Sequence, residues 1–249
     1  MGVIGGVLEQ EIEQELDVGR THGRARYSTY WGTEFWEPVR AALADADAVL
    51  DVGSGRRPTI EPAERPRHVT YVGLDVSAKE LSRAPRGAYD ETVAADAKDL
   101  VAELVDRFDL IVSWQVLEHV QDLSAAAANF HAYARPGGKF VAMLSGRYAA
   151  HAVANRFLPT GLARRFVARL RGRRVDTVFP AYYDHCDERG LRDAFSSWET
   201  LEVLPLWRGA DYFERLPGLL PLYLRYEDLA IRRGWTQSAT NYVVVATKG

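Results

Sequence analysis

The sequence predicts a single α/β domain with a doubly wound, mostly parallel sheet. Short runs rich in Val, Ile, Leu and aromatic residues recur along the chain, and each is bounded by Gly, Pro or Asp. Helical stretches separate several of these runs. Apolar strands that alternate with helices are typical of parallel sheets with right-handed crossovers. At 249 residues, the chain is long enough to bury a sizeable core.

The expected elements begin with an N-terminal cap over residues 1–46, which is acidic and helical at first and aromatic further on. Pro38 stands near the start of a helical segment that leads into the first strand. The clearest later helix is expected over 118–134. Seven strands are expected, at 48–52, 69–75, 91–96, 108–113, 138–144, 199–206 and 241–248.

The alternation of strands and helices is lost in two stretches, 146–198 and 207–236. The chain has no internal repeats and no low-complexity tracts. We therefore interpret 1–249 as one domain that carries two insertions, which are expected to form a substrate site or a lid.

Composition excludes several classes of protein. The net charge is −3 and the pI is near 6.1, so no overall positive field would attract nucleic acid. The single cysteine, Cys186, excludes an intrachain disulfide and a zinc site built from several cysteines, and no metal is expected. No apolar run reaches the roughly 18 residues that span a bilayer, and the first residues lack the basic start of a secretory signal. These features predict a soluble, cytoplasmic protein.

A glycine turn follows the first strand, in the stretch V-L-D-V-G-S-G-R-R-P. Ligands of open α/β sheets lie beyond the carboxyl ends of the strands, and Gly53 and Gly55 would allow close approach there. A dinucleotide fingerprint would need a third glycine where Pro58 stands. Asp51 would disfavour a pyrophosphate and suits a cationic partner such as a sulfonium. A tight turn without a ligand is the alternative.

Two further carboxylates are expected at the same edge of the sheet. Asp75 ends the second expected strand, where it could accept hydrogen bonds from a ribose diol. Asp96 ends the third, where it could meet an adenine amine. A single Asp at a strand end is commonly a cap or turn residue. Together, the three carboxylates indicate a groove for an adenosine with a positively charged amino-acid tail.

Five ordered motifs carry a resemblance to a known family. They are V-L-D-V-G-S-G, Y-V-G-L-D-V-S, A-A-D-A, F-D-L-I-V-S-W-Q-V-L-E-H-V and A-R-P-G-G-K-F-V. In this order, over residues 49–141, they resemble class I S-adenosylmethionine-dependent methyltransferases. The resemblance implies a Rossmann-like, seven-stranded sheet whose last strand is antiparallel and inserted beside the fifth.

The resemblance also implies a cofactor, S-adenosyl-L-methionine, with S-adenosyl-L-homocysteine as the product. It implies roles for Gly53, Ser54 and Gly55 at the methionine portion, and for Asp75 at the ribose. The remaining implied cofactor residues, at the adenine and near the methyl group, are Val76, Asp96, Ala97, Ser113, Trp114 and Gln115. The chain departs from the family at Arg56-Arg57-Pro58, because many members have a third glycine at position 57.

An acceptor hydroxyl would need a base near the ends of the fourth and fifth strands. His185 lies just before a helical segment and is flanked by Asp184 and Asp187, which could orient it. His119 is expected to start the helix after the fourth strand. The alternatives are a solvated loop for His185 and a local backbone contact for His119. We expect His185 to be the base before His119.

The insertions suggest the kind of acceptor. The first contains a run of arginines with no acidic residue among them, which would suit an anion or line a solvated face. These arginines are Arg147, Arg156, Arg164, Arg165, Arg169, Arg171, Arg173 and Arg174. The second insertion is apolar, interrupted by proline and basic at its end, so a lid, a homodimer contact and a peripheral membrane contact are all open.

The sequence therefore predicts a methyltransferase that acts, most readily at oxygen, on a small-molecule, glycan or lipid-linked acceptor. A nicotinamide-dependent reductase and a non-catalytic S-adenosylmethionine-binding protein are the competing hypotheses. Nucleic acid is not expected as a partner.

Overall fold

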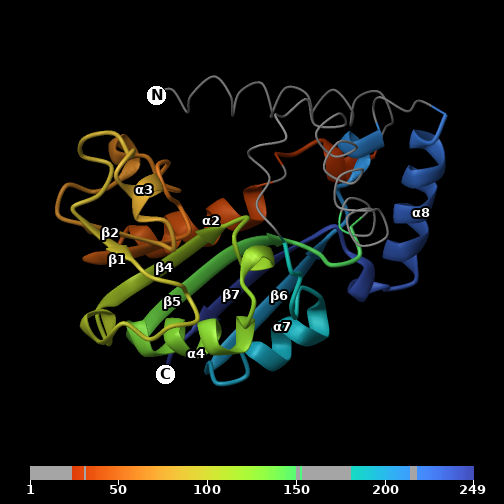
Figure 1. Cartoon of the computed structure of the whole chain (residues 1–249). Helices are drawn as coiled ribbons and strands as arrows, with labels where there is room; N and C mark the ends of the chain where they lie inside the picture. Colours follow the sequence, from red (N-terminus) through yellow and green to blue (C-terminus); the bar gives the residue numbers. More distant parts are fainter. Residues whose placement is uncertain (1–23, 31, 150–151, 153–180, 214–217) are drawn as a thin grey trace.

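A computed structural model describes residues 24–30, 32–149, 152, 181–213 and 218–249. Its centre is a seven-stranded sheet with the strand order β3-β2-β1-β4-β5-β7-β6 (Figure 1). The strands are β1 Ala48–Val52, β2 Thr70–Asp75, β3 Glu91–Ala94, β4 Phe108–Trp114, β5 Ala134–Ser145, β6 Thr200–Leu206 and β7 Asn241–Thr247.

The last strand, β7, pairs antiparallel with both β5 and β6, whereas the other paired strands are parallel. The prediction of a doubly wound sheet with an antiparallel last strand beside the fifth is therefore confirmed. The predicted strand 48–52 is confirmed to the residue. The third strand is shorter than the expected 91–96, because it ends at Ala94.

Helices cover both faces of the sheet (Figure 1). One face packs against α2, and the other packs against α4 and α7. Successive strand residues point to opposite faces, so Val49 joins the first cluster and Leu50 the second. The helices are α2 Thr33–Leu43, α3 Ala78–Leu81, α4 Leu123–Tyr133, α7 Glu188–Ala194 and α8 Leu220–Arg232.

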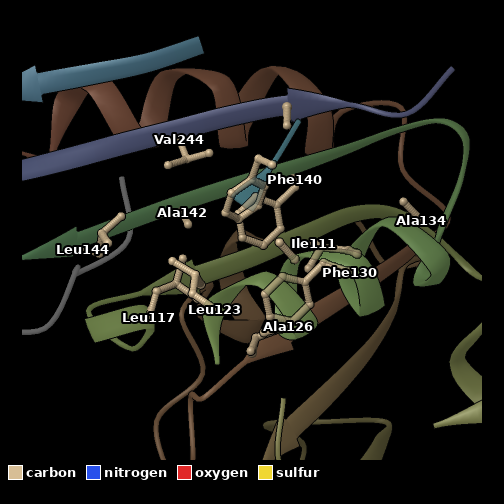
Figure 2. Packing of buried hydrophobic residues seen from close by; sticks show 14 of the residues in the cluster. Ile111, Leu117, Leu123, Ala126, Phe130, Ala134, Phe140, Ala142, Leu144 and Val244 are labelled. Atoms are coloured by element: carbon tan, nitrogen blue, oxygen red, sulfur yellow. The ribbon is translucent and has the colours of Figure 1, made fainter. Parts of the chain in front are cut away.

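The larger core is centred on Phe140 of β5 (Figure 2). Its ring centroid lies 5.1 Å from that of Phe130 on α4 and 5.0 Å from that of Phe195 at the end of α7. All three side chains are completely buried. The described end of the first insertion is thus packed against the sheet as part of the domain, where α7 adjoins α4.

Two helix predictions need correction. The expected helix 118–134 is divided: a 3₁₀ turn covers Leu117–His119, and α4 begins only after Asp122, whose side chain accepts a hydrogen bond from the Ala125 N–H at 3.0 Å. His119 therefore ends a short turn and does not start the helix. Pro38 lies inside α2, because that helix begins at Thr33.

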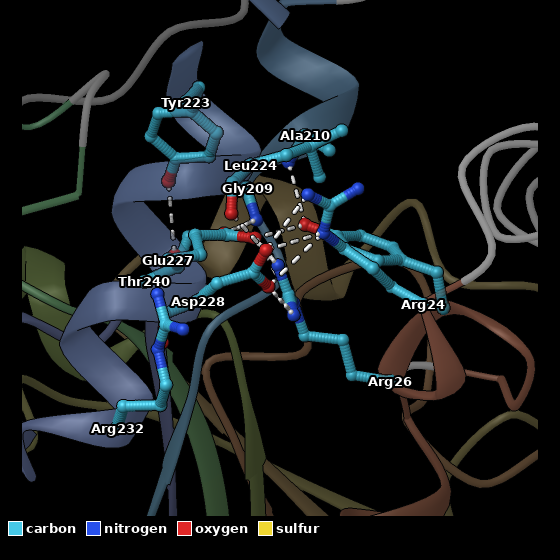
Figure 3. A network of polar contacts seen from close by, with 11 residues as sticks. Arg24, Arg26, Gly209, Ala210, Tyr223, Leu224, Glu227, Asp228, Arg232 and Thr240 are labelled. Carbon is cyan, nitrogen blue, oxygen red and sulfur yellow. Dashed lines mark hydrogen bonds and ion pairs between the residues drawn. The ribbon is translucent and has the colours of Figure 1, made fainter. Parts of the chain in front are cut away.

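The segment 24–30, where the described part of the N-terminal cap begins, docks on α8 through a polar network (Figure 3). Arg26 and Arg24 both bind Asp228, with nitrogen–oxygen distances of 2.7 and 2.8 Å. Glu227 is fully buried and accepts hydrogen bonds from Arg26, from the Tyr27 hydroxyl at 2.7 Å and from the Gly209 N–H at 2.9 Å. Two segments far apart in sequence are thereby joined.

Among the helices of the described ranges, none has the length and apolar character needed to cross a bilayer. The same ranges contain no cluster of three or more His, Cys, Asp or Glu side chains suited to a metal ion.

Candidate cofactor and acceptor site

The parallel strands bring the predicted cofactor residues to one edge of the sheet. Val52 at the end of β1 pairs with Leu74 of β2 and with Ser113 of β4, so the three strands end side by side. The glycine loop, Asp75 and Gln115 each follow one of these ends. The edge that the sequence predicts for a ligand is therefore assembled by strand register alone.

Glycine is required at the start of the loop after β1. Gly53 has φ +75° and Gly55 has φ +55°, values that side chains rarely allow. A Cβ at Gly53 would lie 2.2 Å from a methyl carbon of Val116. The Gly53 N–H donates a hydrogen bond to the carbonyl of Leu74 at 2.7 Å, which fixes the loop against β2.

Asp51 holds this loop in place through hydrogen bonds from Thr59 and Tyr71, which we term the Asp51 clamp. The carboxylate is completely buried and accepts hydrogen bonds from the Thr59 N–H and hydroxyl, each at 2.6 Å, and from the Tyr71 hydroxyl at 2.7 Å. Burial raises the pKa of Asp51, while these hydrogen bonds act in the opposite direction. The expectation that this carboxylate faces a sulfonium is wrong for this structure, because it is closed to solvent and bound within the protein.

The departure from the family at Arg56-Arg57-Pro58 has a structural counterpart. The Arg57 N–H donates to the carbonyl of Ser54 at 3.0 Å and closes a turn, and the chain then reaches the Asp51 clamp at Thr59. Arg56 extends to Glu80, with a nitrogen–oxygen distance of 3.5 Å. A third glycine is therefore not needed to turn the chain here.

Tyr89 supports the loop from the side, and sequence reasoning missed it. Its hydroxyl lies 2.5 Å from the Ser54 hydroxyl and donates to the carbonyl of Gly55 at 3.0 Å. Gly73 makes room for the ring, since a Cβ there would lie 2.7 Å from it. A glycine inside a strand signals such a close approach, but it does not say which side chain approaches.

Asp75 and Val76 stand at the end of β2 as predicted. Asp75 is half-buried, and one carboxylate oxygen accepts the Ser77 N–H at 2.7 Å. Burial raises the pKa of Asp75, and the nearby Glu80 raises it further. Val76 leaves 72% of its surface exposed. An apolar side chain so exposed beside a carboxylate is suited to cover a flat apolar ring.

Asp96 and Ala97 lie beyond the end of β3. The Asp96 carboxylate is held by Lys98, whose ammonium lies 3.2 Å away and whose N–H donates at 3.2 Å. The carbonyl of Ala97 accepts a hydrogen bond from Asn129 of α4 at 2.9 Å. The third strand end is thus tied to the helix that covers this face.

At the end of β4, Ser113 is completely buried and donates to the carbonyl of Val52 at 3.3 Å. The ring centroid of Trp114 lies 4.7 Å from that of Phe35 and 5.9 Å from that of Trp36, and both of these residues are on α2. The aromatic cluster of the N-terminal cap is thus divided, because Phe35 joins the core and Tyr27 joins α8. A further aromatic residue of this cap, Trp31, lies outside the described residues.

A polar cluster lies between the ends of β4 and β5. Gln115 has φ +55°. Its side-chain amide oxygen, Oε1, accepts a hydrogen bond from the Ser145 hydroxyl at 2.8 Å. Glu118 is 4% exposed, and one carboxylate oxygen accepts the Ser145 N–H at 3.3 Å. Burial raises the pKa of Glu118, and the neighbouring His119 opposes that shift.

Two atoms of this cluster have no hydrogen-bond partner within the described part of the chain. They are the amide nitrogen of Gln115 and the second carboxylate oxygen of Glu118, and both are buried. Buried polar atoms are nearly always paired. An unpartnered donor and an unpartnered acceptor in one cluster leave two hydrogen bonds that a bound molecule could complete. Sequence reasoning did not single out Glu118.

The segment that carries His185 is attached to the same cluster. The N–H groups of Tyr182 and Tyr183 donate to the main-chain carbonyl of Glu118 at 2.9 and 3.0 Å. Tyr183 and His185 have φ +54° and +52°. Together with Gln115, they place three left-handed non-glycine residues in one region, and such strain concentrates at functional sites.

His185 faces Asp184, as the sequence predicts. The distance from His185 Nδ1 to Asp184 Oδ1 is 2.9 Å, close enough for an ion pair although the alignment is not that of a hydrogen bond. Asp184 also accepts the Leu123 N–H at the start of α4, at 3.3 Å. Asp187 does not orient the imidazole, because it caps α7 through Gly190 and binds Arg147 at 3.1 Å.

Arg147 belongs to the predicted arginine run, and the structure places it beside this cluster. Its main-chain N–H donates to the carbonyl of Cys186 at 2.8 Å, and its side-chain Nε is buried with no partner among the residues described. The other arginines of the run, from Arg156 to Arg174, lie outside the described residues.

A separate hollow of about 310 Å³ lies at the carboxyl end of β6. Arg26, Glu34, Trp207 and Arg208 contribute to its lining. An ion pair of 3.0 Å between Arg208 and Glu34 crosses this region. None of the predicted cofactor residues lines the hollow, so the hollow is distinct from the strand-end edge that carries them.

Comparison with known proteins agrees with this geometry. A family model described as a methyltransferase domain matches residues 26–199, which is more than half of the chain. The chain belongs to this family of methyltransferase domains, in the class I, S-adenosylmethionine-dependent group that its motifs resemble. The hypothesis of a nicotinamide-dependent reductase is set aside by this membership.

Curated relatives include ubiquinone biosynthesis O-methyltransferases. The protein of Methylobacterium nodulans is 30% identical over 115 residues, covering 45% of this chain and 46% of the relative. That of Pseudomonas syringae pv. tomato is 32% identical over 109 residues, covering 42% and 46%. The matches therefore span less than half the length of these relatives.

Solved structures share the fold. A methyltransferase from Mesorhizobium loti superposes with a TM-score of 0.52 at 20% identity, covering 87% of this chain and 99% of that one. The phosphoethanolamine N-methyltransferase 2 of Haemonchus contortus, in complex with S-adenosyl-L-methionine, gives 0.51 at 14% identity, covering 99% and 60%. At these identities the likeness concerns the fold.

The loop clamp can be tested with Asp51→Asn. The new amide nitrogen cannot accept hydrogen bonds from Thr59 or Tyr71, so buried donors lose their partners. We expect the free energy of unfolding to fall by about 1–3 kcal/mol in urea titrations of the ligand-free protein.

The matched control is Asp45→Asn, an exposed carboxylate just before β1 at the opposite edge. Its effect should stay within about 0.5 kcal/mol. An Asp51→Asn variant of unchanged stability that loses only cofactor affinity would show that Asp51 acts on the ligand rather than on the loop.

Proposed function

We propose that this protein transfers a methyl group from S-adenosyl-L-methionine to a hydroxyl oxygen of a small-molecule acceptor. The observation that carries the proposal is the polar cluster between β4 and β5, where Gln115 and Glu118 keep buried, unpartnered atoms and where Gln115, Tyr183 and His185 adopt left-handed backbone conformations. Relatives named ubiquinone biosynthesis O-methyltransferases support oxygen as the acceptor atom. Glycan and lipid-linked acceptors remain within the proposal.

The residues at the strand-end edge fit the cofactor of this family. When bound, S-adenosyl-L-methionine supplies an electrophilic methyl group carried on a sulfonium. Asp75 would accept hydrogen bonds from its ribose diol, and Val76 would cover its adenine. Gly53 and Gly55 would present backbone without side chains to the methionine portion of the cofactor. Ser54 and Gln115 would lie on either side of that portion. The fit rests on the exposed Val76 and on the half-buried Asp75 carboxylate.

His185 is proposed as the general base. Nδ1 faces Asp184, which leaves Nε2 to take the proton of the acceptor hydroxyl as its oxygen attacks. The Asp184 carboxylate would then stabilise the imidazolium, and its bond to the N–H of Leu123 keeps it in place. Gln115 and Glu118 would bind and orient the molecule that receives the methyl group. The Gln115 amide nitrogen would donate a hydrogen bond to it, and the unpartnered Glu118 oxygen would accept one.

Cofactor binding is tested by calorimetric titration of Asp75→Ala with S-adenosyl-L-homocysteine. Loss of a charged hydrogen-bond acceptor should weaken binding about 10- to 100-fold. In the wild type, the ionised carboxylate is the binding form and burial raises its pKa. The affinity should therefore be full at neutral pH and fall on acidification, beginning at a higher pH than for an exposed Asp.

Asp45→Ala serves as the matched control and should bind like the wild type. An Asp75→Ala variant that binds S-adenosyl-L-homocysteine with unchanged affinity would remove this carboxylate from the cofactor site.

The base is tested with His185→Gln against a panel of phenols, glycans and amines, with methyl transfer followed from labelled S-adenosyl-L-methionine. For hydroxyl acceptors, kcat/KM should fall about 10²- to 10⁴-fold, with cofactor affinity unchanged.

His68→Gln replaces an exposed histidine next to β2; it is the control and should keep the wild-type kcat/KM. His119→Gln distinguishes the second candidate. If His119→Gln lowers kcat/KM by this factor and His185→Gln leaves it unchanged, the base is His119 and the assignment to His185 is wrong.

A further inference from the structure

Helix α8 is apolar on the side that faces away from the domain. Its inward side buries Leu220, Leu224 and Ala230. On the outward side, a row of apolar side chains at helical spacing is exposed, which we term the α8 stripe. Its members are Leu219 (48% exposed), Leu222 (65%), Tyr226 (38%) and Leu229 (37%). Soluble helices usually expose polar residues on this side, so the stripe needs an explanation.

The orientation of α8 is fixed by its inward polar contacts (Figure 3). Glu227 is completely buried and binds Arg26, Tyr27 and the N–H of Gly209. Asp228 binds Arg24 and Arg26. Rotation of the helix to bury the α8 stripe would break these bonds and leave buried charges unpaired, which is strongly unfavourable.

The charged side chains that α8 and its end fully expose beside the stripe are all positive. Arg225, Arg232 and Arg233 are exposed on the helix or at its end. The two acidic residues of α8, Glu227 and Asp228, are both occupied by the inward network. The helix thus presents an apolar row beside cations, with no acidic side chain of its own on that side. Trp235, 45% exposed, follows directly after the helix.

We propose that the α8 stripe docks on the surface of an anionic lipid bilayer. A helix that lies in a membrane interface combines an apolar row with flanking arginines, which pair with acidic headgroups while the apolar side chains enter the headgroup region. Tyr and Trp side chains also favour this region. The contact is peripheral.

A second copy of the chain fits the same surface less well. In a symmetric dimer, each α8 stripe would meet its own equivalent, so the three arginines of one copy would lie opposite those of the other. A 13-residue helix is about 20 Å long, and one face of it is small beside the roughly 800 Å² that each partner buries in a stable interface. A charged bilayer satisfies both the apolar row and the arginines.

The test is co-sedimentation of the full chain with large unilamellar vesicles. Vesicles of phosphatidylcholine with about 30% phosphatidylglycerol should bind the wild type, and pure phosphatidylcholine vesicles should bind it at least tenfold less. A triple variant, Arg225→Gln/Arg232→Gln/Arg233→Gln, should lose at least tenfold in partitioning. Leu222→Ser/Tyr226→Ser should lose a similar factor, because it removes the apolar part of the contact.

Matched controls change the same chemistry elsewhere on the surface. Arg67→Gln/Arg86→Gln/Arg189→Gln removes the same charge from other exposed positions, and Leu100→Ser removes an exposed leucine. Both should bind vesicles like the wild type.

Three results would overturn the proposal. The first is a wild type that does not bind anionic vesicles. The second is an equal loss in the charge control and in the α8 variants. The third is a concentration-dependent dimer that the α8 variants abolish while vesicle binding persists. None of these outcomes bears on cofactor binding or methyl transfer, which are measured without vesicles.

Discussion

The parallel pairing of β1 with β2 and β4 is the constraint on which the candidate site depends. Because Val52 pairs with both Leu74 and Ser113, three strands end at one level, and their loops share one edge. The hydrogen bond from Gly53 to Leu74 then turns the first loop toward β2. A shift of one residue in this register would reverse the faces of the strand and move Asp51 out of its clamp.

Asp51 and Glu118 are both buried carboxylates, and both lose hydration on folding, but the protein compensates for this loss in different ways. Burial raises the pKa of both Asp51 and Glu118. Asp51 recovers the cost through hydrogen bonds from Thr59 and Tyr71, so it stabilises the loop. Glu118 keeps one buried oxygen without a partner in the described chain. In the proposed function, the methyl acceptor would supply this missing hydrogen bond, which would link the burial of Glu118 to binding.

The sheet could be predicted from the sequence because its strands carry local apolar patterns, and the first of them is matched to the residue at Ala48–Val52. The strand-end positions of Asp75 and Val76 follow from that pattern. The role of Asp51 could not be predicted, since its partners come from a turn and from the next strand. Glu118 and Tyr89 were missed for the same reason: their environments exist only after β5 and β2 have packed beside them.

The most direct test of the account is a crystal structure of the protein with S-adenosyl-L-homocysteine. The account predicts the ribose within hydrogen-bond distance of Asp75, the adenine against Val76, and the homocysteine portion over Gly53 with its sulfur toward the Gln115–Glu118 side. Binding of the ligand in the hollow lined by Glu34 and Trp207, with no ligand at the strand-end edge, would contradict it.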